Sequence, residues 1–304
     1  MFKLSFHRFS LSLSCCASIV LAACGGGGGA AADAQTLPAA QAAAPAPTTV
    51  VSAATTVNPI PEAVAAPVAA EPAPFGQDAG GYKLTFNEEF DIFNSGIWND
   101  HIWYQGSNAT KNYTVENGSL KIWPQRDANG NFFDRTIDTD GKYTQTYGYF
   151  EMEAKLPVGK GTWPAFWLFN HIGERRPEMD IMEAYAGGNG WGNTDAQGIA
   201  HPTAFAPTIW IGDYEGHQAG TKMTQVGIDL SADFHKYAVK WEPNKQTYYF
   251  DGKEIYSVNV AMTDPMYIML DLWFGSASGT PDDSTPQGKN NAYEVKYVRA
   301  WQFK

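Results

Sequence analysis

The stretch Tyr147-Gly-Tyr-Phe-Glu-Met-Glu-Ala-Lys-Leu156 alternates between apolar and polar side chains. In an extended chain, successive side chains point to opposite faces, so such a stretch separates into two sets. The expected core face holds Phe150, Met152, Ala154 and Leu156, and the expected polar face holds Tyr149, Glu151 and Glu153. This pattern predicts a β-strand that packs on one side only.

The same period of two recurs toward the C-terminus. Residues 237–241, 246–250 and 253–258 read as strands, separated by a turn at 242–245 and by Asp251-Gly252, which is a strong hairpin signal. In the last segment, Tyr293, Val295, Tyr297, Trp301 and Phe303 are expected to share a face. No long stretch shows helical spacing with caps. We therefore predict an all-β fold, a β-sandwich (jelly roll) of two curved antiparallel sheets with an open concave cleft.

Three acids, Glu178, Asp180 and Glu183, lie within six residues of one another. On a regular strand Glu178 and Asp180 share a face, whereas Glu183 points the other way. A β-bulge near Ile181 or Met182 would insert one residue and bring all three carboxylates onto one face.

A solvated face with chance acids is the simpler explanation of this cluster. The flanking residues Met179, Ile181 and Met182 argue against it, because they indicate a central, packed strand. Crowded carboxylates raise one another's proton affinity, which keeps one of them protonated near neutral pH. A protonated acid beside an ionised carboxylate is the pair that glycosidic bond cleavage requires.

The arrangement Glu178-x-Asp180-x-x-Glu183 resembles the bulged active-site signature of glycoside hydrolase family 16, the laminarinase and agarase type. The resemblance covers residues 82–303. It is carried further by Tyr147-Gly-Tyr-Phe-Glu-Met-Glu-Ala-Lys-Leu-Pro157, Gly161-Thr-Trp-Pro-Ala-Phe-Trp167, Phe234-His-Lys-Tyr-Ala-Val-Lys-Trp241, Tyr249-Phe-Asp-Gly252 and Tyr297-Val-Arg299.

The resemblance implies a retaining endo-β-glycanase in which Glu178 is the nucleophile, Glu183 the acid/base and Asp180 the residue that tunes and orients the nucleophile. The implied substrate is β-1,3 or mixed β-1,3/1,4-glucan. Three alternatives stay open: a glycanase acting on a bacterial exopolysaccharide, a transglycosylase, and a non-catalytic carbohydrate-binding lipoprotein. The acid triad argues against the last, because a binding module has no use for both glutamates.

Several residues are candidates for substrate binding. Trp163, beside Pro164 at the start of a strand, is expected at a cleft edge as a sugar-stacking platform, whereas Trp167 is interpreted as core. Further candidates are His201, Trp210, Trp273, Arg135 and Asn112. For His201, a hydrogen-bonded structural role is the alternative, and Trp273 stands where the family usually has a smaller residue.

No metal or other cofactor is expected. Many relatives bind calcium through an acid in the final strand, and here that position is Lys296, whose ammonium cannot ligate calcium. The backbone near Glu88 and Glu89 leaves one residual possibility.

The N-terminus carries basic residues, then an apolar run that is too short to span a bilayer, as in a secretory signal peptide. Leu21-Ala22-Ala23-Cys24 resembles the bacterial lipoprotein cleavage box, which implies a signal peptide at 1–23 and lipidation of Cys24. An ordinary signal peptide is the alternative. Residues 24–80, rich in Ala, Pro and Gly, are expected to form a disordered tether to a catalytic domain at 81–304. The expected location is the bacterial outer membrane, on its periplasmic or cell-surface face.

The formal net charge is −11. Nucleic acids and anionic lipids require a Lys/Arg-rich surface, so neither is expected as a partner, whereas a neutral polysaccharide is compatible with this charge. We expect a monomer.

Overall fold

A computed structural model describes residues 71–212 and 216–304. The predicted signal peptide, the lipidation site Cys24 and most of the predicted tether lie outside the described residues and stay predictions. In the part of the chain that the structure describes, no helix is long and apolar enough to cross a membrane.

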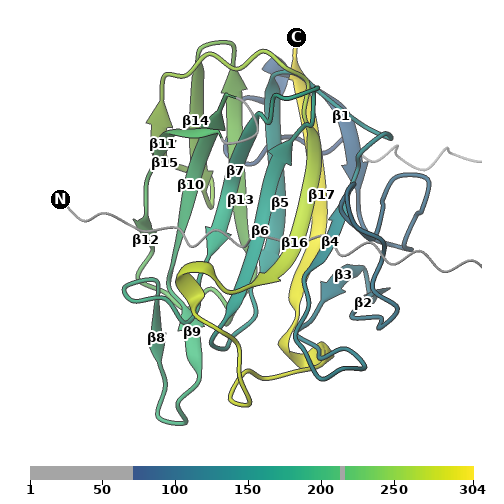
Figure 1. Ribbon diagram of the computed structural model, residues 1–304. Helices are drawn as coiled ribbons and strands as arrows, with labels where there is room; N and C mark the ends of the chain where they lie inside the picture. Colours follow the sequence, from purple (N-terminus) through teal and green to yellow (C-terminus); the bar gives the residue numbers. More distant parts are fainter. Residues whose placement is uncertain (1–70, 213–215) are drawn as a thin grey trace, which may run out of the picture. The chain divides into compact units, whose positions relative to one another are not determined.

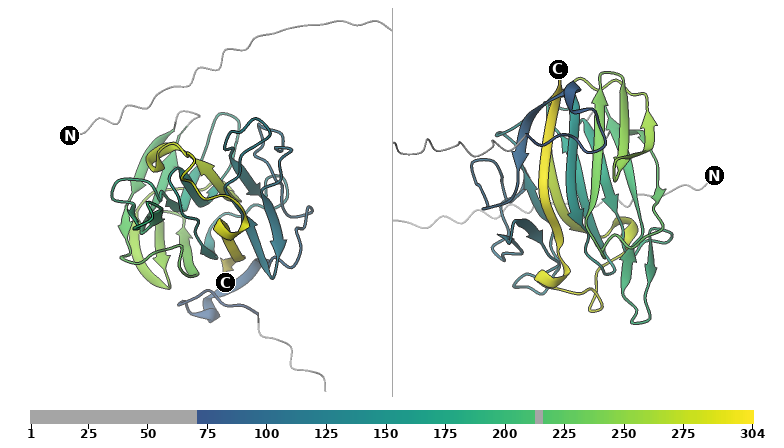
Figure 2. Two further views of the ribbon diagram at one scale, coloured as in Figure 1. Left: turned by 90° about the horizontal axis from the view of Figure 1, so that it is seen from below. Right: turned by 180° about the vertical axis from the view of Figure 1, so that it is seen from behind.

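The chain forms two large antiparallel sheets, which we call the front sheet and the back sheet (Figure 1). The front sheet has the order β11-β10-β7-β6-β16-β4, with β12 paired to β10, and the back sheet has the order β15-β14-β13-β5-β17-β3-β2, with β1 paired to β17. The view from below in Figure 2 shows them as two layers. The predicted all-β sandwich is confirmed.

The front-sheet strands are β4 (Arg135–Asp138), β6 (Thr162–Phe169), β7 (Glu178–Ala184), β10 (Ala204–Ile211), β11 (His217–Thr221), β12 (Thr224–Gln225) and β16 (Tyr267–Phe274). The back-sheet strands are β1 (Tyr82–Glu88), β2 (Tyr113–Glu116), β3 (Ser119–Ile122), β5 (Gly148–Lys155), β13 (His235–Glu242), β14 (Lys245–Phe250), β15 (Lys253–Val258) and β17 (Tyr293–Phe303). A separate hairpin joins β8 (Gly192–Thr194) and β9 (Ala200–Pro202), and the described 3-10 helices are η1 (Ala79–Gly81), η2 (Ser276–Ser278) and η3 (Lys289–Asn291).

The main core lies between the two sheets. Phe150 and Met152 of β5 belong to the same fully buried cluster as Phe166 of β6 and Met179 of β7. The alternation predicted for β5 therefore places its apolar set correctly, and burial of this set stabilises the sandwich through the hydrophobic effect.

The other face of β5 is not the solvated polar face that the sequence predicts. Tyr149 is 0% exposed because it packs against Tyr82, Tyr249 and Trp301, and Glu151 is only 1% exposed because an upstream segment contacts it. The Trp301 indole N–H donates to the Pro72 carbonyl (2.9 Å), and the Phe75 amide donates to Glu151 Oε2 (3.0 Å). Among the described residues, contacts with the back sheet therefore extend upstream as far as Pro72.

The last strand also departs from the simple alternation. Its pairing with β5 shifts register between Val295 and Tyr297, so the residues beyond this point change face. Val298 and Ala300 join the main core, whereas Trp301 packs on the outer face of the back sheet. The prediction that Trp301 shares a face with Val295 is wrong for this reason.

The hairpin prediction is confirmed. β14 and β15 are joined by Asp251 (φ 47°) and Gly252 (φ 76°), both in the left-handed region that a two-residue hairpin turn requires.

Candidate active site

The strand β7 has one residue more than its neighbours between Asp180 and Glu183, because the register shifts against both β6 and β10. Ile181 is the residue without a partner on β6. The bulge brings Glu178, Asp180 and Glu183 to the lining of one pocket. The predicted bulge is thus confirmed.

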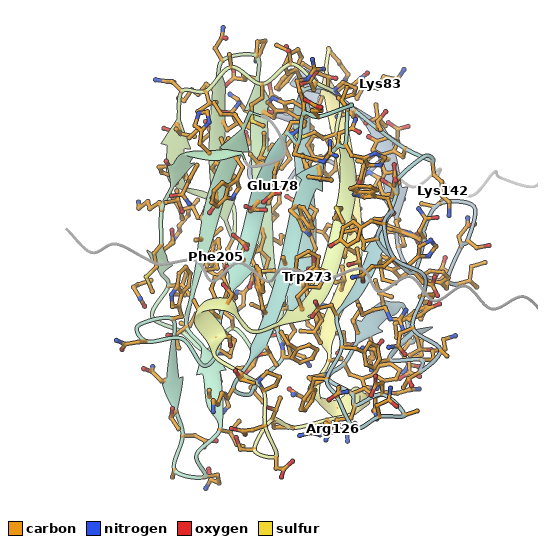
Figure 3. The ribbon with its side chains drawn as sticks, in the orientation of Figure 1. Lys83, Arg126, Lys142, Glu178, Phe205 and Trp273 are labelled. Atoms are coloured by element: carbon orange, nitrogen blue, oxygen red, sulfur yellow. The ribbon has the colours of Figure 1, made fainter. Side chains whose placement is uncertain are left out.

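This pocket, which we call the acid pocket, has a volume of about 120 Å³. Figure 3 places Glu178 and Trp273, two of its residues, on the front sheet. Its complete lining is Trp163, Ala165, Trp167, Glu178, Asp180, Glu183, Asp271 and Trp273. The lining contains four carboxyl groups and no Lys or Arg among the described residues.

Asp271 is the acid that the sequence interpretation missed. It lies on β16 at 1% exposure, and its Oδ2 accepts a hydrogen bond of 2.7 Å from the Trp167 indole N–H. Asp271 Oδ1 and Asp180 Oδ2 are buried without a hydrogen-bond partner in the described chain. Unpaired buried carboxyl oxygens are costly unless the group is protonated, so these two acids favour their neutral form.

The crowding of acids raises their pKa values. Loss of water around Glu178, together with the negative charge of Glu183, raises the pKa of Glu178 to about 8. Burial, followed by the charges of Glu183 and Glu178, raises the pKa of Asp180 well above its usual range. The cluster therefore retains protons at neutral pH, which a general acid requires.

Glu183 has more hydrogen-bond donors than its neighbours. Burial raises the pKa of Glu183, and three hydrogen bonds offset part of this rise. They come from the Tyr185 hydroxyl and the Trp163 indole N–H, both 3.0 Å from Oε1, and from a bond shared with Asp180. Within the cluster these donors stabilise negative charge on Glu183. Asp180 is thus bonded to Glu183, whereas the family resemblance implies that it acts on Glu178.

Three tryptophans surround the acids. Trp273 meets Trp163 edge to face at a centroid distance of 5.5 Å and Trp167 at 5.9 Å. Trp163 lies in the pocket lining, in keeping with its predicted place at the cleft. Trp167 is only 6% exposed and packs in a buried cluster with Ala165 and Phe169, so its interpretation as core is confirmed. Its indole N–H also donates to Asp271, and its ring lines the acid pocket. Trp167 reaches the pocket because it pairs with Asp180 and so shares its face.

Trp210 lies on β10 directly opposite Glu178. Directly paired residues project from the same face of a sheet, so its half-buried indole flanks the nucleophile candidate. It stands outside the acid pocket itself.

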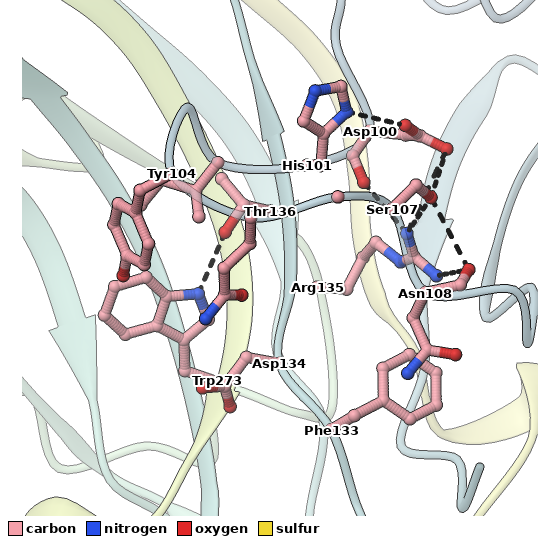
Figure 4. Close-up of a pocket in the computed structure, with 13 residues that line it drawn as sticks. Asp100, His101, Tyr104, Ser107, Asn108, Phe133, Asp134, Arg135, Thr136 and Trp273 are labelled. Carbon is pink, nitrogen blue, oxygen red and sulfur yellow. Dashed lines mark hydrogen bonds and ion pairs between the residues drawn. The ribbon is translucent and has the colours of Figure 1, made fainter. Parts of the chain in front are cut away.

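Arg135, labelled in Figure 4, and Asn112 are both buried structural residues. Arg135 is 2% exposed, and its guanidinium donates to Asn112 Oδ1 (2.7 Å), to Ser107 Oγ (3.0 Å) and to the carbonyls of Asp100, Asn108 and Thr110. Asn112 is 0% exposed, so its predicted contact with substrate is wrong. Arg135 instead holds the 100–110 loop as the wall of a second pocket of about 330 Å³ that adjoins Trp273.

His201 lies apart from the acids, in a pocket of about 260 Å³. Its Nδ1 is 2.8 Å from Asp229 Oδ2 and its Nε2 is 3.2 Å from Asp195 Oδ2. These contacts fit the alternative interpretation, a hydrogen-bonded structural histidine.

Two exposed aromatic residues were not singled out from the sequence. Trp103 (39% exposed) and Tyr104 (56%) line a fourth pocket of about 410 Å³ together with Glu178, Trp167 and Trp273. Adjacent aromatic residues in a polar loop are the signal that points to such a surface.

The positions considered for a metal are occupied by other contacts. Lys296 Nζ donates to Glu153 Oε1 (2.9 Å), and the Glu88 carboxylate accepts from the Phe90 amide (2.7 Å) and the Trp98 indole (2.9 Å). Among the described residues, no group of three or more His, Cys, Asp or Glu is arranged to hold a metal ion.

A β-sandwich in which paired carboxylates and tryptophan side chains line the same pocket is an arrangement suited to a polysaccharide-cleaving enzyme. Residues 100–299 match glycosyl hydrolases family 16, and the chain belongs to this family.

Two curated relatives come from Rhizobium meliloti (strain 1021). The chain is 30% identical over 233 residues to the endo-1,3-1,4-beta-glycanase EglC, covering 73% of this chain and 45% of the relative. It is 26% identical over 266 residues to the endo-1,3-1,4-beta-glycanase ExsH, covering 74% and 53%. The chain thus spans about half the length of these relatives.

Among solved structures, the laminarinase catalytic domain from Thermotoga maritima MSB8 is similar, with a TM-score of 0.59 and 26% identity. The match covers 73% of this chain and 98% of that domain.

Proposed function

We propose that this protein is a retaining endo-β-glycanase that hydrolyses a β-linked polysaccharide, with β-1,3 or mixed β-1,3/1,4-glucan as the substrate. The observation that carries the proposal is the bulge of β7, which brings Glu178, Asp180 and Glu183 together in one pocket. The names of the relatives, endo-1,3-1,4-beta-glycanase and laminarinase, support the substrate class.

In this reaction Glu178 attacks the anomeric carbon while Glu183 protonates the departing glycosidic oxygen. The resulting glycosyl-enzyme ester is then hydrolysed by water, from which Glu183 removes a proton. The donors around Glu183 suit this second half, in which Glu183 must carry the negative charge. In the first half-reaction the pair of glutamates holds the same single proton, but the proton is on Glu183 and the negative charge is on Glu178.

The walls of the site suit a neutral sugar chain. Trp163, Trp167 and Trp273 in the acid pocket, with Trp103 and Tyr104 beside it, offer aromatic surfaces for the C–H faces of pyranose rings. No Lys or Arg of the described residues lines the acid pocket, so the sulfate groups of a sulfated galactan would find no electrostatic attraction there.

The test of substrate is a reducing-end assay across laminarin, barley glucan, agarose, carrageenan and a succinoglycan-type exopolysaccharide. We expect laminarin and barley glucan to be cleaved to oligosaccharides. Cleavage of another polymer with both glucans inert would contradict the β-glucan assignment.

The roles of the two glutamates are tested by azide rescue with an activated aryl β-glycoside. Glu178→Ala should yield an α-glycosyl azide, because azide enters where the nucleophile stood, and Glu183→Ala should yield a β-glycosyl azide. The opposite stereochemistry at the two positions would reverse the roles.

We also propose that the chain is exported and lipid-anchored through Cys24. The cleavage-box resemblance at residues 21–24 supports this. Cys24→Ala should move the protein from the membrane to the soluble fraction; continued membrane attachment would contradict the anchor.

A further inference from the structure

Tyr185 follows Glu183 by two residues and points to the same part of the site. Its side chain is 8% exposed, and its hydroxyl donates a hydrogen bond of 3.0 Å to Glu183 Oε1. The Trp163 indole N–H, from β6, donates to the same oxygen at 3.0 Å. One oxygen of Glu183 therefore receives two donors, one from β6 and one from the residue that directly follows β7.

A carboxyl oxygen that accepts two hydrogen bonds has both of its lone pairs engaged. A proton placed on Oε1 would point at the donors of Tyr185 or Trp163, whereas a proton on Oε2 meets neither of them. The hydrogen bond that Glu183 shares with Asp180 then falls to Oε2, which keeps one further lone pair for the proton. We propose that Tyr185 is a positioning residue for Glu183: together with Trp163 it holds Oε1, so that Oε2 is the atom that gives and receives the catalytic proton. This inference rests on the proposed function.

The proton then follows one path in both half-reactions. As Glu178 bonds to the anomeric carbon and the C–O bond breaks, the Oε2 proton passes to the leaving oxygen. In the second half Oε2 takes a proton from water, while the water oxygen bonds the anomeric carbon and the Glu178 ester breaks. Between the two halves, the donors on Oε1 stabilise the Glu183 carboxylate.

Tyr185 is fixed by the protein. Its ring packs against Trp191 at a centroid distance of 4.7 Å and against Trp163 at 5.5 Å, and its hydroxyl has a further hydrogen bond with Ser276 of η2. Burial and the charge of Glu183 raise the pKa of Tyr185, so it stays a donor at any working pH. The titratable groups that face Glu183 are Glu178, Asp180, Asp271 and Tyr185.

The first experiment measures how kcat/KM of the Tyr185→Phe variant depends on pH, with the polysaccharide that the reducing-end assay identifies as the substrate. Loss of one donor should move the alkaline limb upward by about one pH unit, because the Glu183 carboxylate is less stabilised. We expect kcat on the polysaccharide to fall about 10-fold, with a smaller loss on an aryl glycoside whose leaving group needs no protonation.

Tyr149→Phe is the matched control. Tyr149 lies on the outer face of the back sheet, far from the acid pocket in the fold. It is fully buried, and its hydroxyl has no hydrogen-bond partner among the described residues. Its profile should match the wild type, and the melting temperatures of both variants show whether they fold. An unmoved alkaline limb in folded Tyr185→Phe would overturn the proposal.

The second experiment asks whether Tyr185 acts through Glu183. In a Glu183→Ala background, azide-rescued turnover should be the same with and without Tyr185→Phe, because the carboxylate that Tyr185 positions is gone. An equal loss in both backgrounds would overturn the proposal and show a structural role. If Glu183→Ala forms no β-glycosyl azide at all, the proposed acid/base role of Glu183 itself fails.

Discussion

Two strands of this molecule carry almost the same sequence, but their acids meet different partners. Glu151-Met-Glu153 lies in β5 of the back sheet, and Glu178-Met-Asp180 lies in β7 of the front sheet. Both are acidic pairs in central strands whose intervening methionine is fully buried in the common core.

The back-sheet acids are paired. Glu153 bonds Lys236 Nζ (2.7 Å) and Lys296 Nζ (2.9 Å), and although partial burial opposes it, these two bonds lower its pKa. Glu151 accepts a hydrogen bond of 2.9 Å from the Tyr297 hydroxyl.

The front-sheet acids face one another instead. Asp180 and Asp271 each keep a buried oxygen without a partner in the described chain, and the acid pocket has no cation in its lining. The comparison teaches that an acid-x-acid pattern acquires its role from neighbouring strands: cations make it structural, and further acids make it reactive.

The sharpest test of this contrast is Glu178→Gln. Removing the nucleophile while keeping its shape should reduce kcat by about 10⁴-fold or more, because the covalent route is lost. The matched variant Glu151→Gln should keep most of the wild-type kcat. Comparable losses of activity at the two positions, measured by reducing-end release, would break the comparison.

Arg135→Lys tests the loop wall beside Trp273. Lysine offers one compact ammonium and cannot replace a guanidinium that donates to five groups, so the 100–110 loop should loosen. We expect KM to rise about 10-fold with little change in kcat, since the acids do not move. A fall in kcat at constant KM would contradict this role.

The pH dependence of stability should have opposite signs for Glu178 of β7 and Glu153 of β5. The pKa of Glu178 is raised from 4.5 to about 8, so its contribution to stability is full below its ordinary value and is lost as pH rises through about 8. Glu178→Gln should therefore melt above the wild type by a few degrees at alkaline pH, and the gap should close near pH 4.

The pKa of Glu153 is lowered, so its contribution is present above its ordinary value and is lost as pH falls. Glu153→Gln should melt below the wild type at neutral pH and approach it in acid. Melting curves over this pH range check both signs; the same sign for the two variants would remove the distinction between these two acids.

The smallest effect is expected at the surface pair of Lys289 and Glu116, 2.9 Å apart. Both side chains reach the solvent, and exposed ion pairs of this kind contribute little to stability. Lys289→Ala should shift the melting temperature by no more than about 3 °C and leave activity unchanged. A larger shift would show that an exposed pair can also stabilise this fold.

The sequence predicts the sandwich and the bulge because both depend on local patterning. Glu183 can point to the same face as Asp180 only if one extra residue is inserted between them, and this residue is Ile181. The role of Trp167 depends on its pairing with Asp180 across β6 and β7, which periodicity within one strand cannot show.

The residues that sequence reasoning missed depend on partners distant in the chain. Asp271 reaches the acid pocket from β16, and its only local signal is that Trp273, two residues on, shares its face. Tyr185 had the same signal, two residues beyond Glu183. The burial of Glu151 depends on Phe75, from a segment whose composition resembles a tether.

The most direct measurement is to trap the glycosyl-enzyme with an activated 2-deoxy-2-fluoro β-glycoside and to locate the added mass by peptide mapping. If the unpaired acids of β7 form a retaining site, the enzyme should be inactivated with one sugar attached to Glu178. A sugar attached to Glu183 would reverse the two roles. Turnover of the natural polymer with inversion and no trapped ester would contradict the retaining site altogether.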